Sequence, residues 1–356
     1  MISDSIALFN LKAVYSPDAE QFFFVWSHEF TLGSKNYAKV RGRFLDLNGK
    51  LSEVKTYSFP QFKLGDELFP ALGYNSRDRK YVLWWNEYGS PDRTIAKGVY
   101  NEGIDLNGRI KNVSRTTRCC LPINSPVAYH PGANRFLMAG SMNLYLFDGS
   151  GALITSPGFI PEIFGPFLFS DPEAFYFYLF SRSSGYHGSV FYQRLSADAE
   201  RRSATLFLKG RDFLPVVNAV YNQQTNEILF LYQDVSSPNP YSELYTSRVD
   251  PTGRQLSEPR PVASNYALGN GFGLAAVDES YLLVYRRKEE IHARLLGRFG
   301  GPIGEDVKIS SNSEFFLFNL TAIGSEQEHR FLIYWTDNIS LQNGHSDLYA
   351  QLVQIE

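Results

Sequence analysis

The chain has few of the residues that build disulfide frameworks and metal sites, and it has no long apolar run. It has 2 cysteines and 6 histidines in 356 residues, and none of its apolar runs approaches the roughly 18 residues of a membrane-spanning helix. So few cysteines exclude a framework of long-range disulfides. No histidine pair has the spacing of metal ligands, so we expect neither a metal ion nor another cofactor.

An excess of positive charge is also missing. The net charge is −3 and the pI is about 6.1, which argues against a nucleic acid held through its phosphates. The opening residues, Met1 to Asp4, have neither a basic segment nor an apolar one. We therefore expect either an intracellular protein or a mature chain or fragment.

The two cysteines, Cys119 and Cys120, are neighbours. Adjacent strand residues point to opposite faces of a sheet, so the simpler interpretation is one buried and one less buried thiol. The alternative is a disulfide between neighbours, as in propeller dehydrogenases that bind a quinone, although such a bond departs from ordinary bridge geometry.

What the chain has in abundance is a repeated apolar pattern. With 44% apolar and 15% aromatic residues it can bury a large core. Seven aromatic-rich runs each end in one residue, here called the anchor, and then turn polar; the anchors are Trp26, Trp85, Ala139, Phe180, Tyr232, Tyr285 and Trp335. Successive anchors lie 41 to 59 residues apart, a period typical of arrays of small β-sheets.

Two further markers divide each repeat into four antiparallel strands, A to D. An aromatic residue or glycine precedes the anchor by 10 or 11 residues in six repeats, which predicts an A–B hairpin. The tetrapeptides DLNG (46–49 and 105–108), DGSG (148–151) and DPTG (250–253) predict the turn between strands C and D. In such a turn the aspartate bonds to the turn backbone and the glycine adopts the left-handed conformation.

Seven four-stranded units predict an all-β fold, a single-domain seven-bladed β-propeller. We expect the blades to span about 11–59, 69–119, 125–160, 165–210, 215–264, 271–311 and 318–356. The last unit ends without a D strand, and residues 1–14 resemble residues 308–323 down to a shared Phe-Asn-Leu. The expectation is that residues 2–8 pair with residues 347–354 and close the ring.

The repeat resembles a family of degenerate β-propeller repeats of secreted and cell-surface, mainly bacterial, proteins. The segments that carry the resemblance are FFFVW with FLDLNG, YVLWW with GIDLNG, ILFLY with SRVDPTG, and FLIYW with DLYAQ. The third unit departs most, with Ala139 in place of the aromatic anchor. The resemblance implies a binding, adhesion or assembly module that is extracellular or on the cell surface, with a cytoplasmic protein as the alternative.

Polar residues recur two positions after each anchor and form a predicted belt. They are His28, Glu87, Ser141, Arg182, Asp234, Arg287 and Asp337. One interpretation is a set of ion pairs between blades, and because a feature of the whole repeat usually belongs to the scaffold we favour it. The other is a polar rim around the mouth of the central channel.

Departures from symmetry indicate where a partner binds. The B–C segments at 27–37, 86–94, 233–242 and 336–346 are long, whereas those of the third and sixth repeats are short. We expect these long segments to be loops, and loops rich in Tyr, Asn, Ser and Gly suit recognition of a protein or polysaccharide. The candidate ligand-binding residues are His28, Tyr37, Tyr88, Arg182, Tyr186, Tyr241 and Arg287.

The sequence leaves two functions open. The first is a non-catalytic interaction module that binds through the B–C face. The second is a carbohydrate-active enzyme with catalytic carboxylates drawn from Glu29, Glu87, Asp234 and Asp337 at the channel mouth, because glycoside hydrolysis generally needs a pair of carboxyl groups. Carboxylates facing each other across a pocket favour the enzyme, and carboxylates held by arginine favour the module.

The anchors generate the first testable prediction. Replacing Trp26, Trp85 or Trp335 with alanine should lower the free energy of unfolding by about 3–5 kcal/mol, because each tryptophan is expected to fill the space between two blades. Chemical denaturation of the three single variants measures this. A loss well under about 1 kcal/mol would place strand B elsewhere in the sequence.

Overall fold

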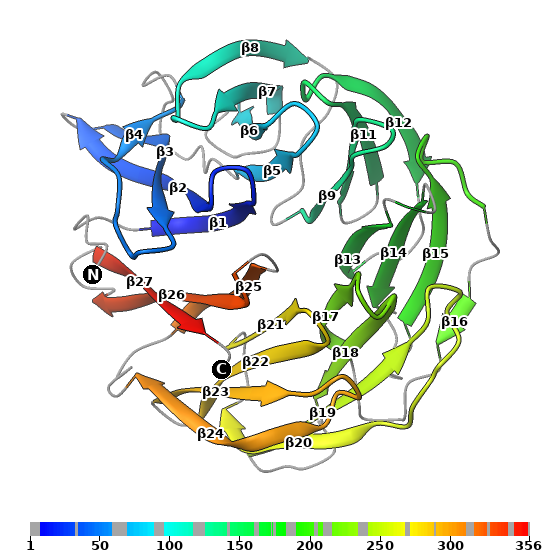
Figure 1. The fold of residues 1–356 in the computed structure, drawn as a ribbon. Coiled ribbons are helices and arrows are strands. Elements are labelled where there is room, and N and C mark those ends of the chain that lie inside the picture. The colour runs from blue at the N-terminus through cyan, green and yellow to red at the C-terminus, as the bar shows by residue number, and fades with distance from the viewer. Residues whose placement is uncertain are drawn as a thin grey trace.

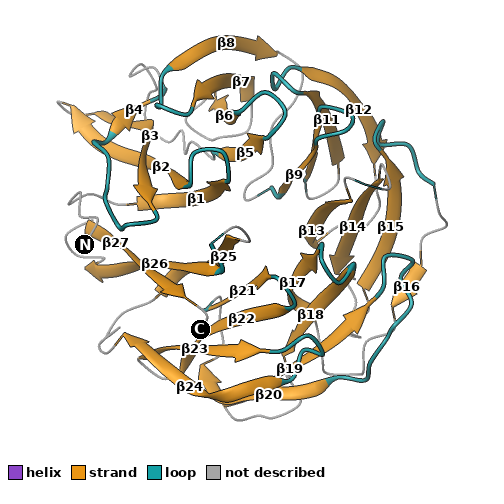
Figure 2. Ribbon diagram, viewed as in Figure 1, coloured by secondary structure: helices purple, strands orange, loops and turns teal. Residues whose placement is uncertain are grey.

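The computed structural model is built from strands alone, and the residues that it describes include no helix (Figures 1 and 2). It describes residues 8–32, 35–58, 70–88, 96–116, 125–140, 143–159, 164–171, 173, 176–182, 190–202, 206–208, 216–233, 241–267, 271–287, 290–310, 317–325, 328–340 and 345–354. The predicted all-β, seven-bladed propeller with antiparallel blades is confirmed.

The strands form seven sheets around a ring, each in the order of the sequence (Figure 1). The first three blades are β1 (Leu8–Ser16), β2 (Gln21–Leu32), β3 (Lys35–Asp46) and β4 (Lys55–Thr56); β5 (Ala71–Asn75), β6 (Lys80–Tyr88), β7 (Ala96–Asp105) and β8 (Ile110–Thr116); and β9 (Val127–His130), β10 (Arg135–Ala139), β11 (Asn143–Asp148) and β12 (Leu153–Phe159).

The other four blades complete the ring. They are β13 (Phe164–Asp171), β14 (Tyr176–Arg182), β15 (Val190–Ser196) and β16 (Leu206–Leu208); β17 (Val216–Asn222), β18 (Glu227–Gln233), β19 (Tyr241–Val249) and β20 (Arg260–Ala267); β21 (Phe272–Val277), β22 (Ser280–Arg287), β23 (Glu290–Leu296) and β24 (Pro302–Ser310); and β25 (Leu317–Ser325), β26 (Arg330–Ser340) and β27 (His345–Gln354).

The predicted A–B hairpins form in the register that the sequence spacing requires. The marker residue of strand A lies opposite a residue in the first half of strand B, before the anchor. The pairs are Tyr15↔Phe22, Tyr74↔Tyr81, Tyr129↔Phe136, Phe169↔Tyr178, Tyr221↔Ile228 and Gly324↔Phe331. This hairpin is therefore a local property of each repeat.

The Asp-x-x-Gly tetrapeptides make the predicted C–D turns. In each of them the first aspartate accepts hydrogen bonds from two backbone amides; Asp46 Oδ1, for example, accepts from the amides of Asn48 (2.9 Å) and Lys50 (2.8 Å). The closing glycines have positive φ angles of 74° to 92°. Blade 4 makes the same turn at 196–199, where the Ser196 hydroxyl replaces the carboxylate. The sequence pattern did not reveal that turn because it has neither aspartate first nor glycine last.

The last blade has three described strands, β25, β26 and β27. Residues 1–7, which we expected to add its fourth strand, lie outside the described residues. Leu8 was included in that expectation, but it pairs with His28 of β2. It therefore belongs to blade 1, because the inner strand of that blade continues through a bulge to its first residue.

Apolar side chains fill all seven contacts between blades, here called seams. Each of the seven core clusters draws its residues from two neighbouring blades. One of them joins Trp26 of blade 1 to Tyr334 of blade 7, so the ring is closed by a packed core. The side chains of Trp26, Trp85 and Trp335 are 1%, 0% and 7% exposed, which confirms the predicted burial of these anchors.

The C–D turns also dock onto the preceding blade by hydrogen bonds. The turn carbonyls of blades 1 to 6 accept bonds from Arg330 (to Leu47), Gln21 (to Leu106), Trp84 (to Gly151), Arg135 (to Ala197), Tyr192 (to Pro251) and Thr246 (to Gly300). Each donor lies in the blade before the turn, and blade 7 supplies the donor for blade 1. We call this contact the turn clasp.

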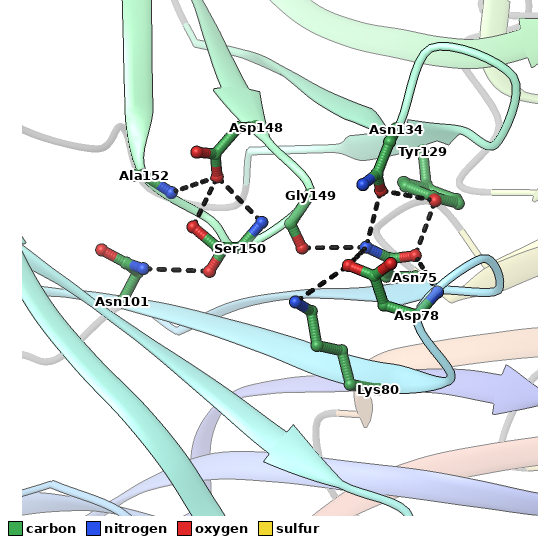
Figure 3. A network of polar contacts seen from close by, with 10 residues as sticks. All are labelled: Asn75, Asp78, Lys80, Asn101, Tyr129, Asn134, Asp148, Gly149, Ser150 and Ala152. Carbon is green, nitrogen blue, oxygen red and sulfur yellow. Dashed lines mark hydrogen bonds and ion pairs between the residues drawn. The ribbon is translucent and has the colours of Figure 1, made fainter.

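The clasp between blades 2 and 3 is part of a larger network of side-chain hydrogen bonds (Figure 3). Asn75, fully buried at the end of β5, donates to the carbonyl of Gly149 at 2.8 Å and to Asn134 Oδ1 at 2.9 Å. Its own oxygen accepts from the Tyr129 hydroxyl at 2.6 Å. At Gly151 a Cβ atom would lie 2.4 Å from Val82, so only glycine lets the turn approach this closely.

This network predicts that Asn75→Ala lowers the free energy of unfolding by about 1–3 kcal/mol, because the variant removes the buried donor of the Gly149 carbonyl. Asn48→Ala is the matched control, since Asn48 is an exposed asparagine in a C–D turn. Its effect should stay within about 0.5 kcal/mol. Equal losses in chemical denaturation of the two variants would contradict a special role for the clasp.

Candidate functional site at the B–C face

The belt residues that the structure describes lie where strand B leaves the core. His28, Glu87, Arg182, Arg287 and Asp337 are in strand B of blades 1, 2, 4, 6 and 7. Ser141, Tyr186 and Asp234 lie outside the described residues. The backbone is described but the side chain is not for Glu29, Tyr37, Glu87, Tyr88, Arg182, Tyr241 and Asp337. The roles expected of all these residues therefore stay predictions.

His28 is buried within its blade. It lies on β2 between Leu8 and Lys39 of the neighbouring strands, two residues beyond Trp26. Its side chain is only 3% exposed. Because alternate residues of a strand share a face, His28 lies on the same side of β2 as Trp26, toward blade 7. A ligand on the surface would meet little of this imidazole in the described arrangement.

Arg287 lies at the edge of a polar cluster on blade 6 that is centred on Asp306 of β24. The Tyr285 hydroxyl donates to Asp306 Oδ2 at 2.6 Å. Arg294 Nε lies 3.1 Å from Asp306 Oδ1, and Arg287 Nη1 lies 3.8 Å from Oδ2. Burial, together with this hydrogen bond to a carboxylate, raises the pKa of Tyr285 above its usual value, so the phenol stays a proton donor.

The cluster is anchored to its neighbour, blade 5. Arg294 Nη1 donates to the carbonyl of Val262 in β20 at 2.7 Å. We had expected Arg287 to pair with a residue of a neighbouring blade, but among the described residues its ion pair is with Asp306 of its own blade. The contact between blades is made by Arg294, one strand further out. The sequence pattern did not single out Asp306 and Arg294 because they lie in strands D and C, outside the repeated belt position.

A second group of charges lies nearer the B–C end of the same blade. Glu290 begins β23 and is 3.1 Å from His292 Nε2 and 2.5 Å from Lys308 Nζ. The ammonium of Lys308, and then the imidazole of His292, hold the pKa of Glu290 below its usual value. Both described carboxylates of this region are thus engaged by cationic side chains, the arrangement expected of a scaffold or binding rim.

One charged residue breaks the symmetry of the innermost strands. Seven inner-strand residues lie opposite the position just before each anchor: Lys12, Ala71, Val127, Leu168, Asn218, Gly273 and Thr321. Lys12 is the one charged member of this set. Burial lowers the pKa of its ammonium to about 8. In the sequence, Lys12 is recognisable as a lysine within the apolar run LFNLKAV. The repeat pattern assigns this run to strand A but does not single out the lysine.

The B–C connections differ from blade to blade in a way that the sequence did not reveal. Strand B continues six residues past the anchor in blade 1 (Trp26 to Leu32) and five in blade 7 (Trp335 to Ser340). In blade 3 it stops at the anchor, Ala139. The segments 27–37 and 336–346, which we expected to be loops, are mostly paired strands: Leu32 pairs with Lys35, and Ser340 pairs with His345. Blades 1 and 7 are neighbours, so the two extended hairpins belong to adjacent positions on the ring (Figure 1).

The described part of the chain shows neither a metal centre nor a membrane helix. Within its ranges, no three His, Cys, Asp or Glu side chains are grouped so as to hold a metal ion. The same ranges contain no helix with the length and apolar character to cross a membrane. Cys119 and Cys120 lie outside them.

Comparison with known proteins supports the architecture. No protein-family model matches the chain, and no curated protein matches its sequence. A solved prolyl endopeptidase is similar in structure, with a TM-score of 0.54 and 14% identity over 98% of this chain. This chain spans only about half the length of that enzyme, 50%.

Two other solved structures are similar along most of their own length. The periplasmic gluconolactonase PpgL of Pseudomonas aeruginosa has a TM-score of 0.54 and 14% identity over 83% of both chains. The Cps50 (Swd1) β-propeller domain of Myceliophteria thermophila has a TM-score of 0.51 and 10% identity over 98% of both chains. At these identities the similarity shows the fold alone, a β-propeller.

The cluster on blade 6 generates a prediction. Asp306→Asn should lower the free energy of unfolding by about 1–3 kcal/mol, because it leaves Arg294 partly buried without its carboxylate. The matched control is Glu279→Gln in the same blade, whose pair with Arg298 is 3.0 Å long with side chains 56% and 50% exposed. Loss of that exposed pair should cost about 0.5 kcal/mol or less. Chemical denaturation compares the two, and an Asp306 variant as stable as the control would mean that the cluster does not stabilise the fold.

Proposed function

We propose that the chain is a non-catalytic interaction module that binds a polypeptide or a polysaccharide through its B–C face. The extended hairpins of blades 1 and 7 form the main contact in this proposal. The module belongs to the degenerate propeller repeats of secreted and cell-surface proteins that its sequence resembles, and it works outside the cell or at its surface.

The observation that carries the proposal is the unequal extension of strand B. A feature that serves only the scaffold usually recurs in every repeat, yet strand B continues five or six residues beyond the anchor in blades 1 and 7 and none in blade 3. Both extensions are paired strands, so they can hold a recognition surface in place. Preordered contact residues bind at a smaller entropic cost than a flexible loop.

The composition of the two extensions supports recognition of a polar partner. Residues 30–37 include Phe30, Asn36 and Tyr37, and residues 338–346 include three amide side chains and two hydroxyls. Aromatic rings supply contact area at low conformational cost, and amides and hydroxyls supply adaptable hydrogen bonds. Such surfaces suit extended peptides and sugar chains.

The engaged carboxylates of blade 6 also favour binding over catalysis. A carboxyl group that acts on a glycosidic bond needs a partner carboxyl across a sugar site. Asp306 instead lies within ion-pair distance of Arg294 and Arg287, and Glu290 within ion-pair distance of Lys308. The enzyme hypothesis then depends on Glu29, Glu87, Asp234 and Asp337, and variants of two of them test it.

A hairpin replacement tests the proposed surface. In this variant the dipeptide Asn-Gly replaces residues 30–37, so that it connects Glu29 to Ala38. These two residues already pair with each other across the hairpin. Asn-Gly is the turn favoured by two-residue hairpins. Since the change lies beyond the anchor Trp26, we expect the melting temperature to stay near that of the wild type while partner binding falls at least about tenfold, a loss of about 1.4 kcal/mol.

Binding to polysaccharides is measured on a glycan array. A protein partner is first identified by crosslinking in the native source, and its binding is then measured in solution with the purified partner. Asn48→Ala, which lies in a C–D turn at the other end of the strands, is the control and should bind as the wild type does. A hairpin variant that is folded and binds normally would contradict the proposed surface. Turnover of a sugar substrate that disappears in Glu87→Gln or Asp234→Asn would establish the enzyme instead.

A further inference from the structure

A buried carboxyl group lies in the seam between blades 1 and 2. Glu102 is in β7, opposite Leu83 of β6 and Val113 of β8, and is only 1% exposed. Ile104, two residues further on, packs in the apolar cluster that contains Val40 and Tyr57 of blade 1. Alternate strand residues share a face, so Glu102 points toward blade 1.

Within the described part of the chain, Glu102 Oε2 has no hydrogen-bond partner. The Tyr57 hydroxyl, 3% exposed in the same seam, also has none there. The two groups are close enough that the charge of Glu102 helps to raise the pKa of Tyr57, after the larger effect of burial. An ionised carboxylate without a partner is costly to bury, and such groups commonly become neutral instead.

Among the described residues, the cationic side chains around this seam are bound elsewhere. From blade 1, Lys55 Nζ donates to the Asn107 carbonyl at 2.6 Å. From blade 2, Lys111 Nζ lies 3.2 Å from Asp105 Oδ2, and Arg115 stacks on the Tyr100 ring at 5.5 Å.

The other titratable neighbours that the structure describes carry no positive charge. Tyr81 on β6 accepts a hydrogen bond from Gln21 at 3.2 Å, and Asp105 is an acid at the end of β7 itself. Burial alone raises the pKa of Glu102, to about 8.

At 1% exposure, an ionised Glu102 would have little access to the water that it needs. The turn clasp of blade 2 closes over the seam: a Cβ atom at Gly108 would lie 3.0 Å from both the Tyr57 hydroxyl and Lys55 Nζ. Solvating a charge at Glu102 therefore requires the 105–108 turn to separate from blade 1.

We propose that Glu102 is a neutral carboxylic acid in the folded protein and that its ionisation loosens the contact between blades 1 and 2. The seam is then a pH-sensitive element of the ring. It is tightest in acid and weakens as the pH rises. The B–C face spans this seam, so loosening it changes the position of the blade 1 hairpin relative to blade 2.

The sign follows from proton linkage. In the unfolded chain the pKa of a glutamate is about 4.3, and in the folded protein that of Glu102 is raised to about 8. The stabilisation by the bound proton is therefore complete below about pH 4.3 and is lost as the pH rises through about 8. Between these two pH values the folded protein keeps the Glu102 proton that the unfolded chain has lost. The unfolding equilibrium constant therefore rises by up to about tenfold for each pH unit.

The first test compares the wild type with Glu102→Gln, whose amide cannot ionise. Chemical denaturation from about pH 5 to about pH 8 should show the ratio of the unfolding constants, wild type to variant, rising by at least about a hundredfold. Glu53→Gln, at an exposed glutamate of blade 1, is the matched control and should show no comparable rise. A ratio that does not change with pH would overturn the proposal.

A second measurement uses the wild type alone, in case the variant does not fold. The carbonyl stretch of a protonated carboxylic acid should be visible by infrared spectroscopy at about pH 7 and disappear above about pH 9. Over the same change, hydrogen-exchange protection of the Tyr57 amide, which bonds to Val40 at 2.9 Å, should fall relative to amides of β22 in blade 6. The proposal would be refuted if Glu102 were already ionised at neutral pH. It would also be refuted if hydrogen-exchange protection fell equally in blades 1 and 6.

Discussion

The structure depends on one recurring contact, the docking of each C–D turn onto the blade before it. Turn carbonyls that face a seam are removed from water, and a buried carbonyl without a donor is costly. The preceding blade therefore supplies a donor at every described turn, from Gln21 in blade 1 to Arg330 in blade 7. Each clasp joins two neighbouring blades, and the donor always lies in the preceding blade. The hydrogen bonds between blades therefore run in the same direction around the ring.

This regularity makes the exceptions informative. Apolar clusters fill all seven seams, and clasps repeat from blade to blade. Against that background, Lys12 is the one charge at its inner-strand position, and Glu102 lies buried in a seam without a described partner for one oxygen. Among the described strands, those of blades 1 and 7 extend strand B by five or six residues. Two of these exceptions, the extended hairpin and Glu102, belong to blades 1 and 2, so recognition and pH sensitivity are proposed for adjoining parts of the ring.

The blade 6 cluster shows why polar residues that gather on a propeller blade need not form an active site. Asp306 accepts a hydrogen bond from Tyr285 and lies within ion-pair distance of two arginines. Arg294 also bonds to the backbone of blade 5. A carboxylate with so many partners is poorly placed to accept a proton from a substrate, but it keeps two blades in register.

The blade count, the A–B hairpins and four of the C–D turns follow from the amino-acid sequence. All of these come from local chemistry: apolar alternation, Tyr15 opposite Phe22, and aspartate with a left-handed glycine in one tetrapeptide. Which groups meet across the seams depends instead on the assembled ring, since Thr246 bonds to Gly300 and Arg330 to Leu47 over separations of 54 and 283 residues. The folded ring also makes segments 27–37 and 336–346 mostly paired strands, because their pairing extends that of the blades. No local pattern specifies either the burial of Glu102 or the partners of Asp306, because both depend on strands that come together only in the tertiary structure.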